Sequence, residues 1–205
     1  MGFTIGGTRR RGRTTECTEM AEYTGLWGWD VVPGARTSGG RCTCGAGSCA
    51  SPGAHPLDPC QEVPAGSTLD DVTKAWSDVP GAAVLLPVGR TFDVIDVARV
   101  AGGHALVRLE RMGLPLGPVL ATASGRAHFF VAPGAAAELP ELLYRMGWDD
   151  ADLDLRGLGP GAHVAVPPSE LVRWLRPPSL DTARPPQARL LLGTLAYIAH
   201  RSAAA

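Results

Sequence analysis

The sequence contains almost no lysine: Lys74 is the only one, against 18 arginines. Acidic and basic residues are nearly equal in number, and the formal net charge of −1 excludes nucleic-acid binding through overall positive charge. Any basic surface must therefore be local. Because alanine and glycine are also abundant, the arginine excess is typical of GC-rich coding, and arginine counts alone carry little weight.

Long hydrophobic runs are missing as well. The longest, over residues 82–88, is far too short to span a bilayer, and residues 1–8 lack the apolar core of a signal peptide. We therefore expect a cytoplasmic protein with no membrane partner. The 205 residues contain no repeat and are enough for one sizeable domain. The 26 glycines and 18 prolines predict many turns and short elements.

The chain is expected to have three parts. Residues 1–13 carry four arginines and no acid, which predicts a flexible basic arm. Residues 14–178 are expected to form the main domain, with a Cys-rich loop at 36–64, and residues 179–205 a C-terminal helix and tail. Strands grouped in pairs with helices between them favour an α+β fold with a largely antiparallel or mixed sheet and flanking helices.

Hydrophobic periodicity and turn residues locate the individual elements. Two strand pairs are predicted, 82–88 with 92–97 and 119–123 with 127–131, each around a short Gly-containing turn. Further strands are expected at 29–32, 152–155 and 163–166, and helices from Thr15, from the capping box at Thr68, and over 100–112, 135–146 and 186–200.

Four soft metal ligands fall within fourteen residues, in the pattern Cys42-x-Cys44-x4-Cys49-x5-His55. The surrounding loop has almost nothing apolar to bury, so tetrahedral Zn²⁺ would order it in a structural role, because four protein ligands leave no open position for water. Cys60 could replace His55 as a ligand. A disulfide or free thiols are the alternative, although an odd cysteine count speaks against disulfides.

Three polar motifs interrupt otherwise apolar stretches: Asp96 within 92–97, Ser124-Gly125-Arg126-Ala127-His128, and Asp152-Leu153-Asp154-Leu155-Arg156-Gly157. Burying charged groups is costly unless a metal, a cation or hydrogen-bond donors replace the water. A shared polar pocket for an anionic, metal-bearing ligand such as a nucleoside triphosphate with Mg²⁺ explains all three. Taken alone, however, the histidine fits a buried core residue, and the Ser-Gly-Arg segment fits a tight turn.

Strand alternation decides which acids can act together. Residues i and i+2 point to the same face of a strand, so the partner position of Asp96 is Ala98, whereas Asp93 belongs to the opposite face. Asp152 and Asp154 would share a face and could supply two oxygens to one site.

The order of these motifs resembles the N-terminal domain of bifunctional DNA primase/polymerases, members of the archaeo-eukaryotic primase superfamily. The resemblance runs from about Ala21 to Ser169. Its most specific part is Asp154-Leu155-Arg156-Gly157 followed by Pro167-Pro168-Ser169, and Ser-Gly-x-x-His at 124–128 is moderately specific. The Cys-rich loop also looks like one in actinobacterial members.

The resemblance implies roles for individual residues. Asp96 and Asp154 would be metal ligands, with Asp152 a further candidate, and would act in catalysis with His128. Ser124, Arg126 and His128 would contact the triphosphate. Mg²⁺ or Mn²⁺ would be the cofactor of an active enzyme, and a nucleoside triphosphate and DNA its partners.

The first motif departs from the family pattern. Asp-x-Asp is replaced by Asp96-Val97-Ala98, and losing one of three acids should cripple catalysis with two metal ions. The favoured hypothesis is a nucleotide- or nucleic-acid-binding domain with weakened or lost nucleotidyl transfer.

Two alternatives stay open. One is an active primase/polymerase that uses Asp96, Asp154 and a substitute for the missing ligand, either Asp152, Asp93 or a water. The other is a non-enzymatic interaction or regulatory protein that binds partners through Trp27, Trp29 or the Cys-rich loop. The sequence identifies no protein partner.

Overall fold

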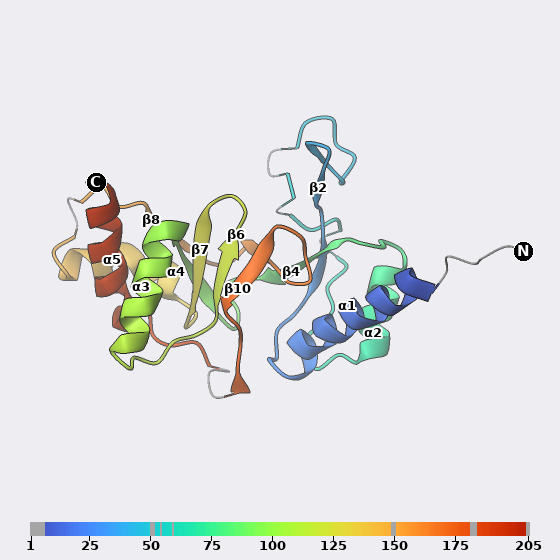
Figure 1. Ribbon diagram of the computed structural model, residues 1–205, viewed down its shortest axis with the longest axis horizontal. Helices are drawn as coiled ribbons and strands as arrows, with labels where there is room; N and C mark the ends of the chain where they lie inside the picture. Colours follow the sequence, from blue (N-terminus) through green and yellow to red (C-terminus); the bar gives the residue numbers. More distant parts are fainter. Residues whose placement is uncertain are drawn as a thin grey trace, which may run out of the picture. The chain divides into compact units, whose positions relative to one another are not determined.

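The computed structural model describes residues 7–49, 52–53, 55–58, 60–148, 151–180 and 184–203. The chain forms two compact units, Met1–Leu86 with His163–Glu170, and Pro87–Ala162 with Leu171–Ala205. Helices and antiparallel sheets occur together, which confirms the predicted α+β class (Figure 1). The predicted main domain at 14–178 contributes to both units.

In the first unit, the residues that the structure describes form two helices, a small sheet and a short hairpin. The helices are α1 (Gly7–Gly25) and α2 (Leu69–Ser77). The sheet has the order β1 (Val32–Gly34), β4 (Ala83–Pro87), β9 (His163–Val166), with β1 and β4 antiparallel. The hairpin pairs β2 (Thr37–Ser38) with β3 (Arg41–Cys42) and belongs to the Cys-rich loop.

The first helix begins earlier than expected. Residues 7–13 of the predicted basic arm belong to α1, so the expectation of an arm followed by a helix near Thr15 is wrong for this stretch. Arginine is among the better helix formers, which accounts for the extension. Residues 1–6 lie outside the described part of the chain.

A buried aromatic pair anchors α1. The ring of Tyr23 stacks on Trp29, with centroids 5.9 Å apart, and its hydroxyl donates to the carbonyl of Pro167 at 2.6 Å. Trp29 is only 2% exposed. The expectation that Trp29 offers a surface to a partner is therefore wrong, because its ring completes the core of the first unit.

The capping box at the start of α2 is confirmed. The hydroxyl of Thr68 accepts a hydrogen bond from the backbone N–H of Asp71, and the Asp71 carboxylate accepts one from the backbone N–H of Thr68. Val72 and Trp76 are buried on the inner side of this helix.

The described residues of the second unit form a five-stranded antiparallel sheet and three helices. The strand order is β10 (Val172–Arg176), β6 (Val119–Thr122), β7 (Arg126–Val131), β5 (Asp93–Ala98), β8 (Leu155–Leu158). The helices are α3 (Arg99–Arg111), α4 (Ala135–Arg145) and α5 (Arg189–Ala203).

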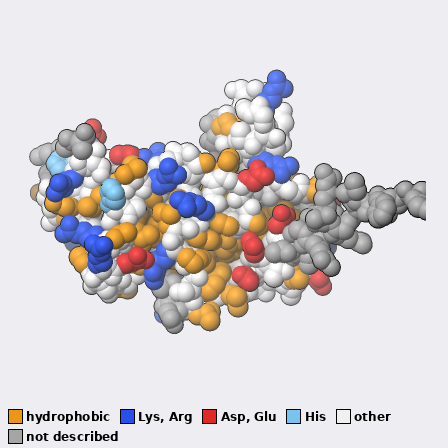
Figure 2. Space-filling view, in the orientation of Figure 1, with side chains coloured by type: hydrophobic (Ala, Val, Ile, Leu, Met, Phe, Trp, Pro, Cys, Tyr) orange, Lys and Arg blue, Asp and Glu red, His pale blue; other side chains and the backbone are white. Residues whose placement is uncertain are grey.

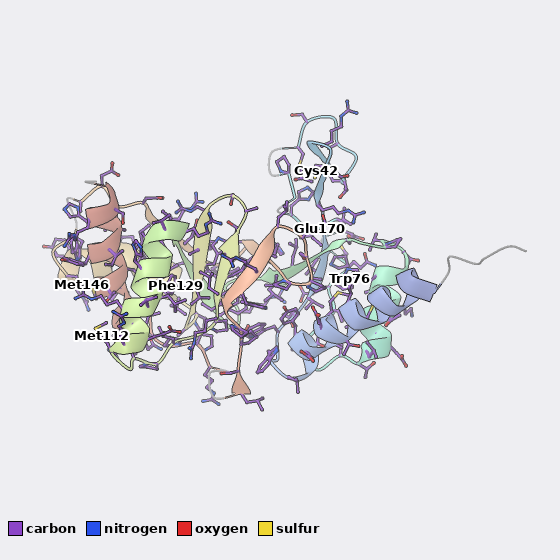
Figure 3. The ribbon with its side chains drawn as sticks, viewed as in Figure 1. Cys42, Trp76, Met112, Phe129, Met146 and Glu170 are labelled. Carbon is purple, nitrogen blue, oxygen red and sulfur yellow. The ribbon has the colours of Figure 1, made fainter. Side chains whose placement is uncertain are left out.

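One face of the five-stranded sheet forms the main core with these helices. Alternate side chains of β5 and β7, including Ile95, Val97 and Phe129, pack in one cluster with apolar residues of α3, α4 and α5. Figure 3 labels Phe129 on β7, next to α3. The C-terminal helix is therefore an integral part of the second unit. The other face of the sheet carries Asp96, Arg126 and His128 beside buried apolar side chains such as Val94 and Phe130.

One predicted strand pair is wrong and the other is confirmed. Strand β4 pairs with β1, and β5 pairs with β7 and β8, so 82–88 and 92–97 are not a hairpin. Both strands are buried along almost their whole length, and a pattern that is apolar on both faces does not select a partner. The hairpin of β6 and β7 is confirmed.

Strand β10 was not predicted, because its charged Arg173 and Arg176 and the neighbouring prolines obscure the alternation. The predicted strand at 29–32 lies later, at Val32–Gly34. No helix among the described residues is long and apolar enough to cross a membrane. In Figure 2, basic side chains over the region of α3 are mixed with acidic and apolar ones, consistent with the near-zero net charge.

Candidate functional site

The cysteine cluster is assembled by tight turns in the first unit. Gly39 and Gly40, both at positive φ (55° and 77°), form the two-residue turn between β2 and β3. Such a turn needs φ > 0 at both positions and matches the twist of the strands. It places Cys42 on β3 and Cys44 just beyond it, facing the later part of the loop.

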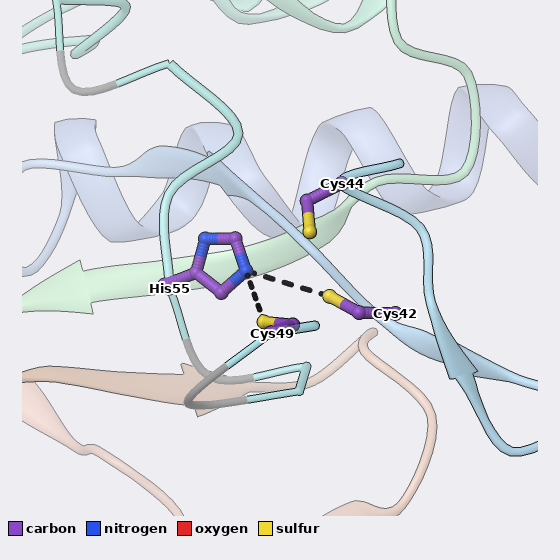
Figure 4. Close-up of side chains that lie close together, drawn as sticks. All are labelled: Cys42, Cys44, Cys49 and His55. Carbon is purple, nitrogen blue, oxygen red and sulfur yellow. Dashed lines mark hydrogen bonds between the residues drawn. The ribbon is translucent and has the colours of Figure 1, made fainter. Parts of the chain in front are cut away.

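The four predicted ligands come together. The ligand atoms of Cys42, Cys44, Cys49 and His55 all lie within 4.8 Å of one another (Figure 4). His55 Nε2 is 3.4 Å from the sulfur of Cys42 and 3.3 Å from that of Cys49. Tetrahedral Zn²⁺, with Zn–S near 2.3 Å and Zn–N near 2.0 Å, sets such N···S separations at about 3.5 Å. The cluster therefore fits a tetrahedral structural metal.

Neighbouring groups prepare these ligands. His55 Nδ1 lies 2.8 Å from the carbonyl oxygen of Pro56, which fixes the ring and directs Nε2 toward the thiols. Hydrogen bonds from the backbone of Cys44 and Gly53 lower the pKa of the Cys42 thiol from 9.0 to about 6. This thiol is therefore largely a thiolate at pH 7, the form that binds metal. Cys60 is exposed and outside the cluster, so His55 is the fourth member.

In the second unit, strand register gathers the polar motifs on the face of the sheet opposite the helices. Asp96 on β5 is paired with His128 on β7 and with Arg156 on β8. Two residues further along β5, and on the same face, Ala98 is paired with Arg126. Directly paired residues of antiparallel strands point to the same face. The side chains of Asp96, Arg126, His128 and Arg156 therefore line one polar site.

Asp96 is the buried centre of this site. Its carboxylate is 1% exposed and accepts one hydrogen bond from Arg126 Nε to Oδ1 at 2.8 Å and one from Arg156 Nε to Oδ2 at 2.5 Å. A buried carboxylate loses its hydration and needs such charged donors. The Arg156 side chain is 66% exposed, so it covers the carboxylate from the solvent side.

Arg126 connects Asp96 to the third motif. Its Nη1 lies 2.7 Å and 2.5 Å from the two carboxylate oxygens of Asp154, while its Nε donates to Asp96. The pKa of Asp154 is lowered, first by the hydrogen bond from Arg126, and the pKa of Arg126 is raised by the same bond. Asp154 is 59% exposed, so solvent screens much of this interaction.

His128, whose side chain is 13% exposed, lies beside this network. Its Nε2 lies 3.6 Å from Asp96 Oδ1, too far for a hydrogen bond, and that oxygen already accepts from Arg126. Burial lowers the pKa of His128, and this effect outweighs the opposing charge of Asp96. We therefore treat the contact as one between a neutral imidazole and a carboxylate, not as an ion pair. Its Nδ1 is buried and has no hydrogen-bond partner.

The turn between β6 and β7 places Arg126 at the start of its strand. Gly125 has φ +80°, as required at the last position of a three-residue hairpin loop, and its N–H donates to the Thr122 carbonyl. The exposed Ser124 shares a 2.8 Å hydrogen bond with the Thr122 hydroxyl, and that hydroxyl accepts from the backbone N–H of Arg126. The tight-turn interpretation is confirmed.

The chain matches the model of a known protein family. The model of the N-terminal domain of bifunctional DNA primase/polymerases matches residues 20–188. The chain belongs to this family. No curated protein and no solved structure matches it significantly.

Ala98, at the position where the resemblance to the family leads us to expect a second acid, has no ligand atom. Asp93 does not compensate: it is fully buried on the opposite face, and its Oδ2 accepts from the backbone N–H of Ala136 at the start of α4. Asp152 is exposed and, like Asp154, lies before β8 begins at Leu155, so the expectation that both share a strand face is wrong.

The acids do not fit a pair of divalent ions. Among the described residues, the only group of three or more Cys, His, Asp or Glu side chains with ligand atoms within 4.8 Å of one another is the cysteine cluster. A dication 4 Å from the Arg126 guanidinium would be repelled by about 8 kcal/mol at an effective dielectric near 20. In this primase/polymerase domain, the place between Asp96 and Asp154 holds a guanidinium group instead.

Sequence reasoning missed Arg156 as a site residue, although it stands in the most specific motif. Only the register of the two strands reveals its position, because Arg156 lies opposite Asp96 when β8 pairs with β5. The glycine that follows has a packing role: a Cβ at Gly157 would lie 2.7 Å from Cα of Ala136, so only glycine lets β8 approach α4.

Proposed function

We propose that this chain is a primase/polymerase-like domain that binds nucleotides or nucleic acid and whose nucleotidyl transfer is weakened or lost. Family membership supports the ligand class. The observation that carries the loss is the combination of Ala98 in the first motif with Arg126 between the two remaining acids. Ser124, Arg126 and His128 are the residues proposed to contact the phosphates.

The test is template-dependent incorporation of labelled nucleotides with Mg²⁺ or Mn²⁺, beside binding of a nucleoside triphosphate and of single-stranded DNA. We expect binding with little or no extension. DNA affinity should fall steeply with salt, because contacts to phosphates release counterions. Robust extension that is abolished by Asp154→Ala would instead select an active enzyme.

If neither the nucleoside triphosphate nor single-stranded DNA binds at low salt, and a protein partner is recovered, the chain is an interaction protein. Trp27, which lies beside Trp29 with ring centroids 6.5 Å apart, and the Cys-rich loop then become the surfaces to test. A cytoplasmic location stays our expectation for a domain that acts on nucleotides.

We further propose that Cys42, Cys44, Cys49 and His55 hold one structural Zn²⁺. The N···S distances and the thiolate form of Cys42 support this. Metal analysis of the purified protein should give one zinc per chain. Cys49→Ser should lose it, and Cys60→Ser is the matched control that should retain it. Equal zinc in both variants would contradict this assignment.

A further inference from the structure

Arg126 makes the contacts that a bridging cation would make. One guanidinium group reaches Asp96 through Nε at 2.8 Å and both oxygens of Asp154 through Nη1 at 2.7 Å and 2.5 Å. Arg156 adds a second positive charge on the remaining oxygen of Asp96. Two carboxylates are thus paired with two guanidinium groups. The site is balanced in charge without any metal ion.

Arg126 and the neighbouring His128 keep ring or guanidinium nitrogens that no group among the described residues binds. Arg126 Nη2 and His128 Nδ1 are buried and have no hydrogen-bond partner. Buried polar atoms are nearly always satisfied, so orphaned ones indicate a missing partner. Arg156 is mostly exposed beside them. N–H donors of arginine and of a suitable histidine tautomer fit the oxygens of a phosphate chain.

We propose that Arg126 replaces the divalent cation between Asp96 and Asp154, so that this site binds the phosphate chain of a nucleoside triphosphate without a metal ion. The inference rests on the proposed nucleotide-binding function and deepens it. It follows from Ala98, since an aspartate there would face Arg126 in the strand register and restore an excess of negative charge. The bound phosphates are held by Arg126, Arg156 and His128.

The test is binding of dATP to the full chain, measured by calorimetry with and without Mg²⁺. Buffers are stripped of divalent ions before the protein is added, because a chelator would also remove a metal from the cysteine cluster. We expect dissociation constants that agree within about threefold in the two conditions. Arg156→Gln keeps an amide donor for Asp96 but removes the positive charge, and it should weaken dATP binding at least about tenfold in both conditions.

A second arm tests the role of Ala98. Ala98→Asp should bind Mn²⁺ at least about tenfold more tightly than the wild type. The loss of the electron paramagnetic resonance signal of free Mn²⁺ measures this binding. The same substitution should make dATP binding depend on the metal. Val100→Asp is the matched control: it adds the same charge at a residue that is 66% exposed on α3, and it should change neither property.

The outcomes separate the two proposals. Binding of dATP that requires Mg²⁺, or that Arg156→Gln leaves unchanged, overturns this inference and leaves the proposed function standing. Binding of single-stranded DNA without dATP does the same. Tight Mn²⁺ binding by the wild type also overturns it. If neither dATP nor DNA binds, both proposals fail.

Discussion

At the scale of single residues, the network around Asp96 is held by one buried carboxylate. Removing it leaves the guanidinium of Arg126, which is only 18% exposed, without its buried partner. Asp154 would still pair with Arg126, but it is 59% exposed and solvent screens that pair, whereas breaking a buried ion pair is strongly destabilising. Asp96 therefore has a structural role that is separate from any role toward a ligand.

We predict that Asp96→Ala lowers the free energy of unfolding by about 3 kcal/mol. Urea unfolding at pH 7, followed by tryptophan fluorescence, measures the change. Asp152→Ala is the control, because this exposed side chain should change stability by less than about 0.5 kcal/mol. Equal stability of the two variants would show that the network around Asp96 contributes little.

The neutral state of His128 predicts a pH dependence. Burial lowers its pKa in the folded protein below the ordinary 6.5. Between the two values the unfolded chain binds more protons, so stability falls as the pH drops below about 6.5 and levels off below the folded pKa. His128→Gln should remove this component. Thermal unfolding between pH 8 and pH 5 measures it.

The matched control is His104→Gln, at an exposed position on α3, which should keep the wild-type pH profile. His55 is present in all three proteins, so its contribution cancels in the comparison. If His128→Gln and His104→Gln give the same profile, His128 is not held in the neutral form by burial.

At the scale of elements, the sequence predicted locally determined features well and the pairing of distant strands less well. The capping box at Thr68 and the hairpin around Gly125 depend on neighbours along the chain, and both are confirmed. Strand β4 joins β1 and β9, which lie far away in the sequence, and an apolar run does not encode that choice. The role of Arg156 was not predicted for the same reason, because it depends on the register of β8 with β5.

Two adjacent glycines of α3 allow the helix-to-sheet contact to be tested. A Cβ at Gly102 would lie 2.6 Å from Cβ of Ala127 on β7, whereas nothing lies within 4 Å of one at Gly103. Gly102→Ala should therefore destabilise by about 1–3 kcal/mol through overpacking. Gly103→Ala should stabilise by about 0.5–1 kcal/mol, because alanine restricts the unfolded chain and favours helix. Opposite signs in chemical unfolding are expected; two values of the same sign would contradict the close packing of α3 on β7.

At the scale of the whole molecule, the sequence predicted the class of the fold and the members of the cysteine cluster, but not the part of Arg156 in the network around Asp96 or the division of the chain into two compact units. The cysteine cluster belongs to the first unit and the network around Asp96 to the second. A metal in the first cluster should order the loop that carries it, because that loop has little apolar surface of its own. The five-stranded sheet is ordered by its own apolar core with α3, α4 and α5.

This division predicts how metal removal spreads. A chelator should increase amide hydrogen exchange in residues 36–49, because the metal contributes most of the free energy that orders such a small loop. Strands β5 and β7 should keep their protection, because their hydrogen bonds lie over a core without metal ligands. Hydrogen exchange with mass spectrometry measures both regions in one experiment. Cys49→Ser should reproduce the chelator's pattern and Cys60→Ser that of the untreated protein, whereas loss of protection in β5 and β7 would mean that the metal stabilises the second unit as well.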